Sequence, residues 1–471
     1  MLTKTDYLLF LEAPLHLWAE KHGRLEQVTP SEYDQHLMQQ GQEIEQLARE
    51  FLQQHFQGAP SPLILTFQDQ LTDGVFQARF DALVYDPAAQ VYDIYEIKSA
   101  STVKKEHLHD VGFQRLVAEA NFKIRYTYLV HVNKEYIRQG SLEVRQLFQI
   151  VNVDEQIEEL RQEILSGRQA AWQVASLDAP DGIEECLKPN SCPCPGVCHP
   201  GLPDHPIYEL PRLHYKKARQ LKSQGVLAIQ EIPEDYPLSE LQEAHLQVVK
   251  TGRPQFDRDG VRAALESLVY PLHFLDYETF NPAVPDYDGY QPYQHVVFQY
   301  SLDIFPAPDA EPTHHEYLGS GNSDPARPLL EHLLARIGPR GSVIVWNQSF
   351  EAGRNREMAK TYPEFASQLE NINDRMFDLM EIFSKGLYIH PEFHGSASIK
   401  NVLPVLAKDL SYDGLSIPKG DAAMMAWVAL TRGQLSAAEI EQTRQDLLRY
   451  CALDTLAMVR NWQALKNLAA V

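Results

Sequence analysis

Two acidic residues stand two positions apart in the apolar, aromatic segment 273–280 (HFLDYETF). We expect this segment to form a buried strand, on which side chains at positions i and i+2 point to the same face. Asp276 and Glu278 would then lie side by side, where two carboxylates repel each other and lose hydration unless a cation lies between them. Carboxylate oxygens without cysteine or histidine partners suit Mg²⁺ or Mn²⁺.

Three more side chains follow in an order that fits such a site. Segment 343–347 (VIVWN) predicts a second buried strand, and Glu351 comes shortly after its end. Segment 447–454 (LLRYCALD) predicts a helix, on which Tyr450 and Asp454 share a face because they are four residues apart. An isolated Asp-x-Glu pair is more typical of a solvated strand edge, but the ordered set of motifs argues against coincidence.

These motifs resemble the DnaQ-like 3′-to-5′ exonucleases of the DEDD type, in the subclass that carries a tyrosine. The resemblance implies an RNase H-like mixed sheet domain in which Asp276, Glu278, Glu351 and Asp454 bind metal and Tyr450 orients the attacking water. Glu351 departs from the family pattern, where aspartate is usual, and is one methylene longer. Two ions about 4 Å apart would stabilise both the attacking and the leaving oxygen of a phosphodiester.

A second set of charged residues lies in the N-terminal half. Segments 77–84 and 91–98 predict the two strands of a hairpin with a turn at 86–89. Glu96 and Lys98 then share one face, with Asp81 on the partner strand. An isolated Glu-x-Lys pair is equally typical of an exposed strand end in an acidic protein.

This second set resembles the PD-(D/E)xK nucleases, and its context resembles their RecB-like branch. The resemblance implies a restriction-endonuclease-type core in which Asp81 and Glu96 bind metal. Lys98 would align the hydrolytic water and offset the charge that develops on phosphorus.

Two neighbouring helices extend the resemblance. Glu45 is the candidate for a further metal ligand, preferred over Glu43, and Gln114 matches the substrate-binding glutamine of the RecB-like branch. The tyrosine that usually follows four residues later is missing, because Ala118 stands there.

Four of the five cysteines gather in one short segment, at Cys186, Cys192, Cys194 and Cys198. In a cytoplasmic protein such a cluster more often binds metal than forms disulfides. RecB-like nucleases with such a cluster take one cysteine from before the core and three from after it, so the resemblance implies a 4Fe-4S centre. Ala13 stands where the early cysteine is expected.

Several alternatives remain open for this cluster. Cys194 is the candidate for the missing fourth thiolate. Tetrahedral zinc is the main alternative to iron and sulfur and is only slightly less favoured, and complete loss of metal is the third. The fifth cysteine, Cys451, stands among apolar residues and is expected to be an ordinary core residue.

The length of 471 residues exceeds one hydrophobic core. We expect an α/β protein with a RecB-like domain over 1–200, whose tail at 178–200 is cysteine-rich. A mostly helical connector over 201–259 and a DnaQ-like domain over 260–471 would follow. Taken whole, the chain resembles members of a bacterial family that joins these parts.

The formal charge of −22 argues against a generic nucleic-acid coat protein. Any path for DNA must therefore be a local basic strip, and the best candidate is segment 205–225, although a solvated helix face explains it equally well. Segment 395–400 is a further candidate for substrate contact through Lys400. No apolar run approaches a membrane span and the start is no signal peptide, so we expect a cytoplasmic protein without a membrane partner.

The expected function is metal-dependent processing of DNA in repair or defence. An RNA-trimming exonuclease is one alternative. A nucleic-acid-binding scaffold subunit with one degenerate site is another, supported by Ala118 and Glu351. The sequence identifies no protein partner.

Overall fold

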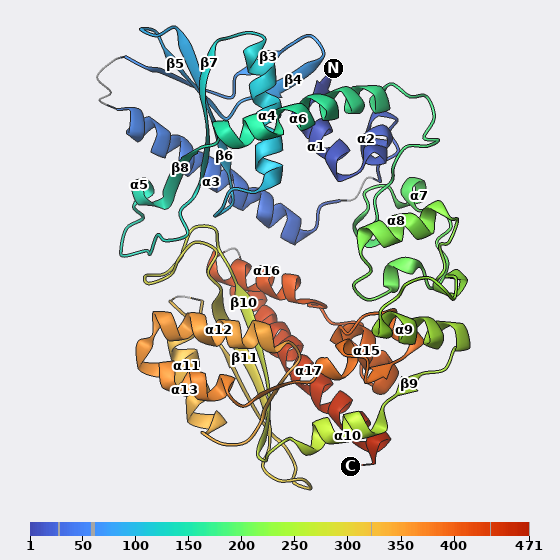
Figure 1. Ribbon diagram of the computed structural model, residues 1–471. Coiled ribbons are helices and arrows are strands. Elements are labelled where there is room, and N and C mark those ends of the chain that lie inside the picture. The colour runs from blue at the N-terminus through green and yellow to red at the C-terminus, as the bar shows by residue number, and fades with distance from the viewer. Residues whose placement is uncertain (27–28, 58–61, 322, 434, 471) are drawn as a thin grey trace. The chain divides into compact units, whose positions relative to one another are not determined.

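The computed structural model describes residues 1–26, 29–57, 62–321, 323–433 and 435–470 (Figure 1). The chain divides into two compact units, the first formed by Met1–Gly201 and Pro282–Tyr293, the second by Leu202–Asn281 and Gln294–Val471. Each unit contains a five-stranded mixed sheet with helices against it, so the predicted α/β class is confirmed. None of the helices in the described ranges is long and apolar enough to cross a membrane.

The main sheet of the first unit has the strand order β2-β5-β6-β7-β8. Only β6 and β7 run parallel, and α4 connects them. Helix α3 packs on one face of the sheet, while α1, α4 and α6 cover the other. The bounds are β2 Ile64–Phe67, β5 Ala82–Asp86, β6 Val91–Lys98, β7 Ile124–Val132, β8 Phe148–Asn152, α1 Lys4–Glu12, α3 Glu32–Phe56, α4 Lys105–Glu119 and α6 Asp154–Ala175.

The hairpin predicted for segments 77–84 and 91–98 needs a correction. The turn is right, because Asp86 pairs with Val91 and its side chain accepts hydrogen bonds from two turn amides. The first strand, however, breaks at residues 80–81. Strand β4 (Phe76–Arg79) belongs to a separate sheet with β1 (Leu2–Thr3) and β3 (Gln70–Thr72), and the chain enters the main sheet only at β5. Asp81 therefore lies in a break between two sheets.

The sheet of the second unit has the order β12-β11-β10-β13-β14, with β10 at its centre. Strand β10 is antiparallel to β11 and parallel to β13. Helix α17 packs against one face of the sheet, while α11 and α12 lie on the other. The bounds are β10 Leu272–Phe280, β11 Val296–Phe305, β12 Thr313–Leu318, β13 Val343–Val345, β14 Met376–Asp378, α11 Ala326–Ile337, α12 Gln348–Thr361 and α17 Ala437–Ala469.

Alternation along β10 decides which side chains reach α17. Phe274 packs with Trp462 of α17, whereas Leu275 and Tyr277 pack with the α11 side. Because Asp276 and Glu278 have the same parity as Phe274, they also face α17.

Residues 202–266 belong to the second unit and are largely helical, with α8 (Tyr215–Ser223), α9 (Glu240–Thr251) and α10 (Arg258–Glu266). An apolar cluster that includes Ile207, Leu221 and Leu246 holds the first part of this stretch together. Its strand β9 (Gln255–Phe256) pairs with β15 (Tyr388–Ile389), which ties it to the later part of the unit. Helices α15 (Ile399–Leu406) and α16 (Gly420–Thr431) complete the unit.

Candidate functional site

Strand β10 and helix α17 bring three acids of the second unit together. Strand β10 packs against α17 (Figure 1). Asp276 and Glu278 lie on the face of β10 toward α17, Asp454 lies in the middle of α17, and the three carboxylates are close enough to interact electrostatically. Glu278 and Asp454 are buried, and Asp276 is partly buried. We call these residues, together with Glu351, the carboxylate site.

Burial, followed by mutual repulsion, determines the electrostatics of this site. Burial, with the charges of Asp454 and Glu278, raises the pKa of Asp276 well above its ordinary value. Burial and the Asp454 charge do the same to the pKa of Glu278. Burial raises the pKa of Asp454 to about 6. The nearby positive charge of Lys400 offsets this only in part. Without a cation, the acids keep protons that a bound divalent ion would replace.

Glu351 lies in the first turn of α12, directly after β13. Its side chain is buried, and its Oε2 atom has no hydrogen-bond partner among the described residues. Burial, together with the charge of Asp378, raises the pKa of Glu351 to about 8. Asp378 ends β14 and accepts hydrogen bonds from the amides of Gln348 (3.1 Å) and Met380 (3.0 Å). Sequence reasoning missed Asp378, although an acid at the end of a strand next to β13 is a usable signal.

Two tyrosines border Asp454. The Tyr412 hydroxyl donates a hydrogen bond to Asp454 Oδ1 at 2.5 Å, and Tyr450 also bonds to this carboxylate. Lys400 Nζ lies 5.4 Å from the ring centre of Tyr412 and 6.0 Å from that of Tyr450, and it donates to the carbonyl of Pro418. Tyr412 follows α15 in a stretch without helix or strand. No local pattern marks it.

Cys451 is buried as expected, but its thiol also faces the carboxylate site. Sγ donates to Asp276 Oδ2 at 3.7 Å, and ligating atoms of Cys451, Asp276 and Glu278 lie within 4.8 Å of one another. The signal was present in the sequence, because Cys451 precedes Asp454 by three residues and shares its helix face.

The first unit gathers three acids and two lysines around the face of β6 toward α4. Lys98 Nζ lies 2.8 Å from Glu96 Oε1 and also pairs with Asp110 of α4. Lys4, at the start of α1, lies 2.8 Å from Glu96 and 3.4 Å from Asp110. The Asp81 carboxylate accepts a hydrogen bond from the amide of Ile97 at 2.9 Å. We call this set the N-terminal site.

Charge is nearly balanced at the N-terminal site, unlike at the carboxylate site. Burial opposes ionisation of Glu96, but the ammonium groups of Lys98 and Lys4 outweigh it and lower the pKa of that carboxyl. Burial and the Glu96 charge raise the pKa of Asp81 to about 7. Lys4 was missed because nothing in the first residues of the chain shows that α1 would reach β6.

Two predicted members of the N-terminal site take other positions. Gln114 is fully buried and donates to Asp110 Oδ1 at 2.9 Å, so it positions Asp110 and presents no free surface to a substrate. Glu45 pairs with Arg49 and accepts a hydrogen bond from Gln68 at 2.8 Å. In the described ranges its ligating atoms do not gather with those of Asp81 and Glu96.

The cysteine segment forms a His/Cys cluster that can bind a metal such as zinc or an iron-sulfur centre. Ligating atoms of His16, Cys186, Cys192 and Cys198 lie within 4.8 Å of one another. His16 belongs to α2 (Pro14–Lys21) and its Nε2 is 3.6 Å from Cys192 Sγ. Three residues after Ala13, it is therefore the candidate for the early ligand that sequence reasoning missed. Cys194 lies beside the group, with its Sγ 3.5 Å from that of Cys198.

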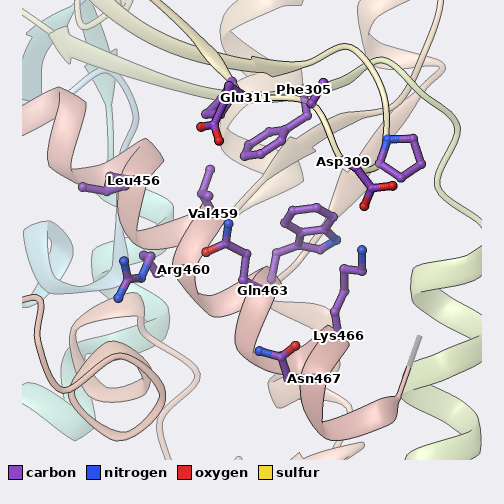
Figure 2. Close-up of a pocket in the computed structure, with 13 residues that line it drawn as sticks. Phe305, Asp309, Glu311, Leu456, Val459, Arg460, Gln463, Lys466 and Asn467 are labelled. Atoms are coloured by element: carbon purple, nitrogen blue, oxygen red, sulfur yellow. The ribbon is translucent and has the colours of Figure 1, made fainter.

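A cavity of about 540 Å³ lies between α17 and the turn that joins β11 to β12 (Figure 2). Its lining carries both signs of charge, from Asp309, Glu311, Arg460 and Lys466. None of the carboxylate-site residues lines it. This cavity is therefore distinct from the carboxylate site.

The raised pKa values predict how pH affects stability without metal. Between the ordinary values of these acids and about pH 8, the folded state keeps protons that the unfolded state releases, so stability falls as pH rises. We expect Asp276→Asn to relieve part of this repulsion. It should raise the free energy of unfolding at about pH 8 by on the order of 1–2 kcal/mol, with little effect near about pH 4.

Chelator-treated protein followed by urea unfolding at both pH values measures this effect. Asp309→Asn, at an exposed acid of the same unit, is the control and should change little. Equal effects of the two substitutions at about pH 8 would contradict the repulsion.

Comparisons with known proteins leave the activity open. Residues 273–398, which include all of β10 except Leu272 and also Glu351, match the model of a domain described as a domain of unknown function, DUF2779. An uncharacterised protein of Mycoplasma pneumoniae is 28% identical over 204 residues, which are 40% of this chain and 31% of that protein. One of Ureaplasma parvum is 30% identical over 209 residues, again 40% of this chain and 30% of the relative. The match thus spans about a third of these relatives. No solved structure matches the chain.

Proposed function

We propose that the protein is a metal-dependent nuclease that acts on DNA, with a 3′-to-5′ exonuclease site in the second unit. The observation that carries the proposal is the convergence of Asp276, Glu278, Glu351 and Asp454. Burial raises the pKa of all four carboxyls, and the charges of the other members raise those of Asp276 and Glu278 further. Such a site is unfavourable without cations and suits oxygen-binding Mg²⁺ or Mn²⁺. The mixed sheet carries Asp276 and Glu278 on its central strand, which supports an RNase H-like fold of the DnaQ-like type for this unit.

The residues fit the ions because their carboxylates are crowded and Glu351 Oε2 has no partner in the described chain. Bound ions would supply electrostatic stabilisation of the attacking and leaving oxygens. Asp276, Glu278 and Asp454 would hold them, with Glu351 as the further ligand. Tyr450 would orient the attacking water. Tyr412 fixes the position of Asp454 through its hydrogen bond, and Lys400 can contact the substrate backbone from the same side.

The basic strip supports nucleic acid as the substrate. Helix α8 and the residues before it present exposed cationic side chains in the second unit, among them Arg212, Lys216 and Arg219. In a chain of charge −22, a local strip of this kind is needed to attract phosphates. DNA is proposed over RNA, and parallel assays on both polymers decide between them.

For the first unit we propose a RecB-like nuclease site in which Asp81 and Glu96 bind metal and Lys98 aligns water. One observation favours a second candidate function, a nucleic-acid-binding scaffold with this site degenerate. Lys4 and Lys98 already compensate Glu96 and Asp110, so a cation adds less there than at the carboxylate site. Activity of the first unit therefore requires its own test.

The exonuclease assignment predicts that Asp276→Ala abolishes release of mononucleotides from the 3′ end of labelled single-stranded DNA with Mn²⁺. Loss of a ligand should reduce the rate at least about 100-fold. Asp81→Ala is the matched control and should keep the wild-type rate. If Asp276→Ala digests 3′ ends normally while Asp81→Ala does not, the activity belongs to the first unit.

If the N-terminal site and the carboxylate site act separately, Lys98→Ala should leave 3′-end digestion largely intact. The variant should fold because Lys4 still compensates Glu96 and Asp110. Circular dichroism checks the fold, and Lys134→Ala, at an exposed lysine, is the control. Loss of all nuclease activity in folded Lys98→Ala protein would instead indicate one composite site.

For the His/Cys cluster we propose zinc. Burial raises the pKa values of Cys186, Cys192 and Cys198, the last to about 12, so a cation is needed to hold thiolates there. Tetrahedral zinc with bonds of about 2.3 Å places sulfur ligands about 3.8 Å apart. The span of 4.8 Å or less among the four ligating atoms fits this arrangement. An iron-sulfur cluster binds each thiolate to a different iron and needs a wider span.

Anaerobic purification tests the metal. We expect colourless protein in which this cluster holds one zinc ion, and His16→Ala should bind that ion at least about 10-fold more weakly. His22→Ala, at the end of the same helix, is the control. Absorbance near about 400 nm with stoichiometric iron and sulfide would instead establish the iron-sulfur centre.

A further inference from the structure

We propose that the second unit binds an additional zinc ion through His205, Glu209 and His394. These residues belong to neither the carboxylate site nor the His/Cys cluster. Glu209 lies between the two histidines: its Oε2 is 2.9 Å from His205 Nδ1, and its Oε1 is 3.0 Å from His394 Nδ1. One ligating atom from each residue lies within 4.8 Å of the others. We call this group the histidine triad.

The backbone holds His394 toward Glu209 in an unusual conformation. His394 has a φ of 51°, in the left-handed region that non-glycine residues seldom adopt, and follows the short helix Pro391–Phe393. Gly395, with a φ of 69°, comes next, and a Cβ atom there would lie 1.7 Å from the carbonyl oxygen of Glu209. Only glycine permits this approach, so the two segments are fixed against each other. Strained backbone of this kind is typical of functional positions.

The other side of the triad is also anchored. The carbonyl of His205 accepts a hydrogen bond from the amide of Ile229 at 2.9 Å, and the amide of Ile207 donates to Leu227 at 2.9 Å. Ile207 is completely buried in the apolar cluster of this stretch. His205 and Glu209 are therefore presented from a packed segment, four residues apart, and their positions do not depend on a long flexible loop.

The donor set selects the class of metal. Two imidazoles and a carboxylate suit zinc, whereas Mg²⁺ prefers oxygen ligands alone. Bonds of about 2.0–2.2 Å in a tetrahedral site separate ligating atoms by about 3.3–3.5 Å. The contacts of 2.9 and 3.0 Å between Glu209 and the imidazoles need only a small expansion to admit the ion. His394 is exposed and the other two ligands are partly exposed, so water can take the fourth position.

A zinc ion here would join residues 205–209 to the turn that precedes α15. That helix carries Lys400, which lies over the tyrosines of the carboxylate site. The inference itself rests only on the ligand geometry of the triad. It stands or falls independently of the nuclease activity.

Zinc counting on the full-length, chelator-treated chain tests the proposal. Equilibrium dialysis against zinc, with excess Mg²⁺ to compete for the carboxylate oxygens, gives the number of ions bound. His394→Asn removes an imidazole but keeps a residue that tolerates the left-handed region. Glu209→Gln removes the charge while keeping a hydrogen-bond acceptor. His214→Asn, at an exposed histidine of the same stretch, is the matched control.

We expect the wild type and His214→Asn to bind one zinc ion more than His394→Asn or Glu209→Gln. In the two triad variants, zinc should bind to this place at least about 10-fold more weakly. With Co²⁺ in place of zinc, charge-transfer absorption from the thiolates should stay the same in all four proteins, which shows that the His/Cys cluster is undisturbed. Equal zinc counts in the wild type and both triad variants would overturn the proposal and leave a hydrogen-bonded triad without metal.

Discussion

Repulsion between buried carboxylates is the constraint on which the second unit depends. Strand β10 directs Asp276 and Glu278 at α17, and α17 returns Asp454 toward them. The apolar contacts around them, such as Phe274 against Trp462, hold the two elements close enough that the acids cannot separate. Packing therefore imposes an electrostatic cost, which divalent cations would remove. If the proposed ions bind, metal binding would also stabilise the fold of this unit.

The two candidate catalytic sites differ in how the charge of their buried carboxylates is compensated. At the N-terminal site, ammonium groups of Lys4 and Lys98 lie against Glu96 and Asp110, and the chain supplies its own compensation. At the carboxylate site Lys400 compensates only in part, and its amine also contacts a carbonyl and two aromatic rings. This contrast makes the second unit the stronger candidate for two-ion chemistry. It also means that the first unit could have a structural role instead of a nuclease activity.

Local periodicity predicts a good part of this arrangement. Alternation along segment 273–280 and the four-residue spacing of Tyr450 and Asp454 are enough to place these side chains on faces that meet. The α/β class follows from the same patterns. The break at residues 80–81 was not predicted, because it arises from pairing of β4 with β1, which is distant in sequence.

Three of the residues that sequence reasoning missed are brought to their sites by tertiary contacts. Lys4, His16 and Tyr412 have no local signature, and each reaches its site from an element far away in the chain. His16 in particular lies with three of the cysteines although Ala13 stands where the early cysteine was expected, because it follows three residues later in the short helix that begins after Ala13. Cys451 and Asp378 did carry local signals. Cys451 shares a helix face with Asp454, and Asp378 stands at the end of a strand.

The most direct test of the central claim is the anomalous diffraction of Mn²⁺ in crystals of the protein. The account predicts strong anomalous peaks among the oxygens of Asp276, Glu278 and Asp454, with two ions about 4 Å apart when both positions are filled. Absence of any peak there at saturating Mn²⁺, with the four acids still crowded together, would contradict it.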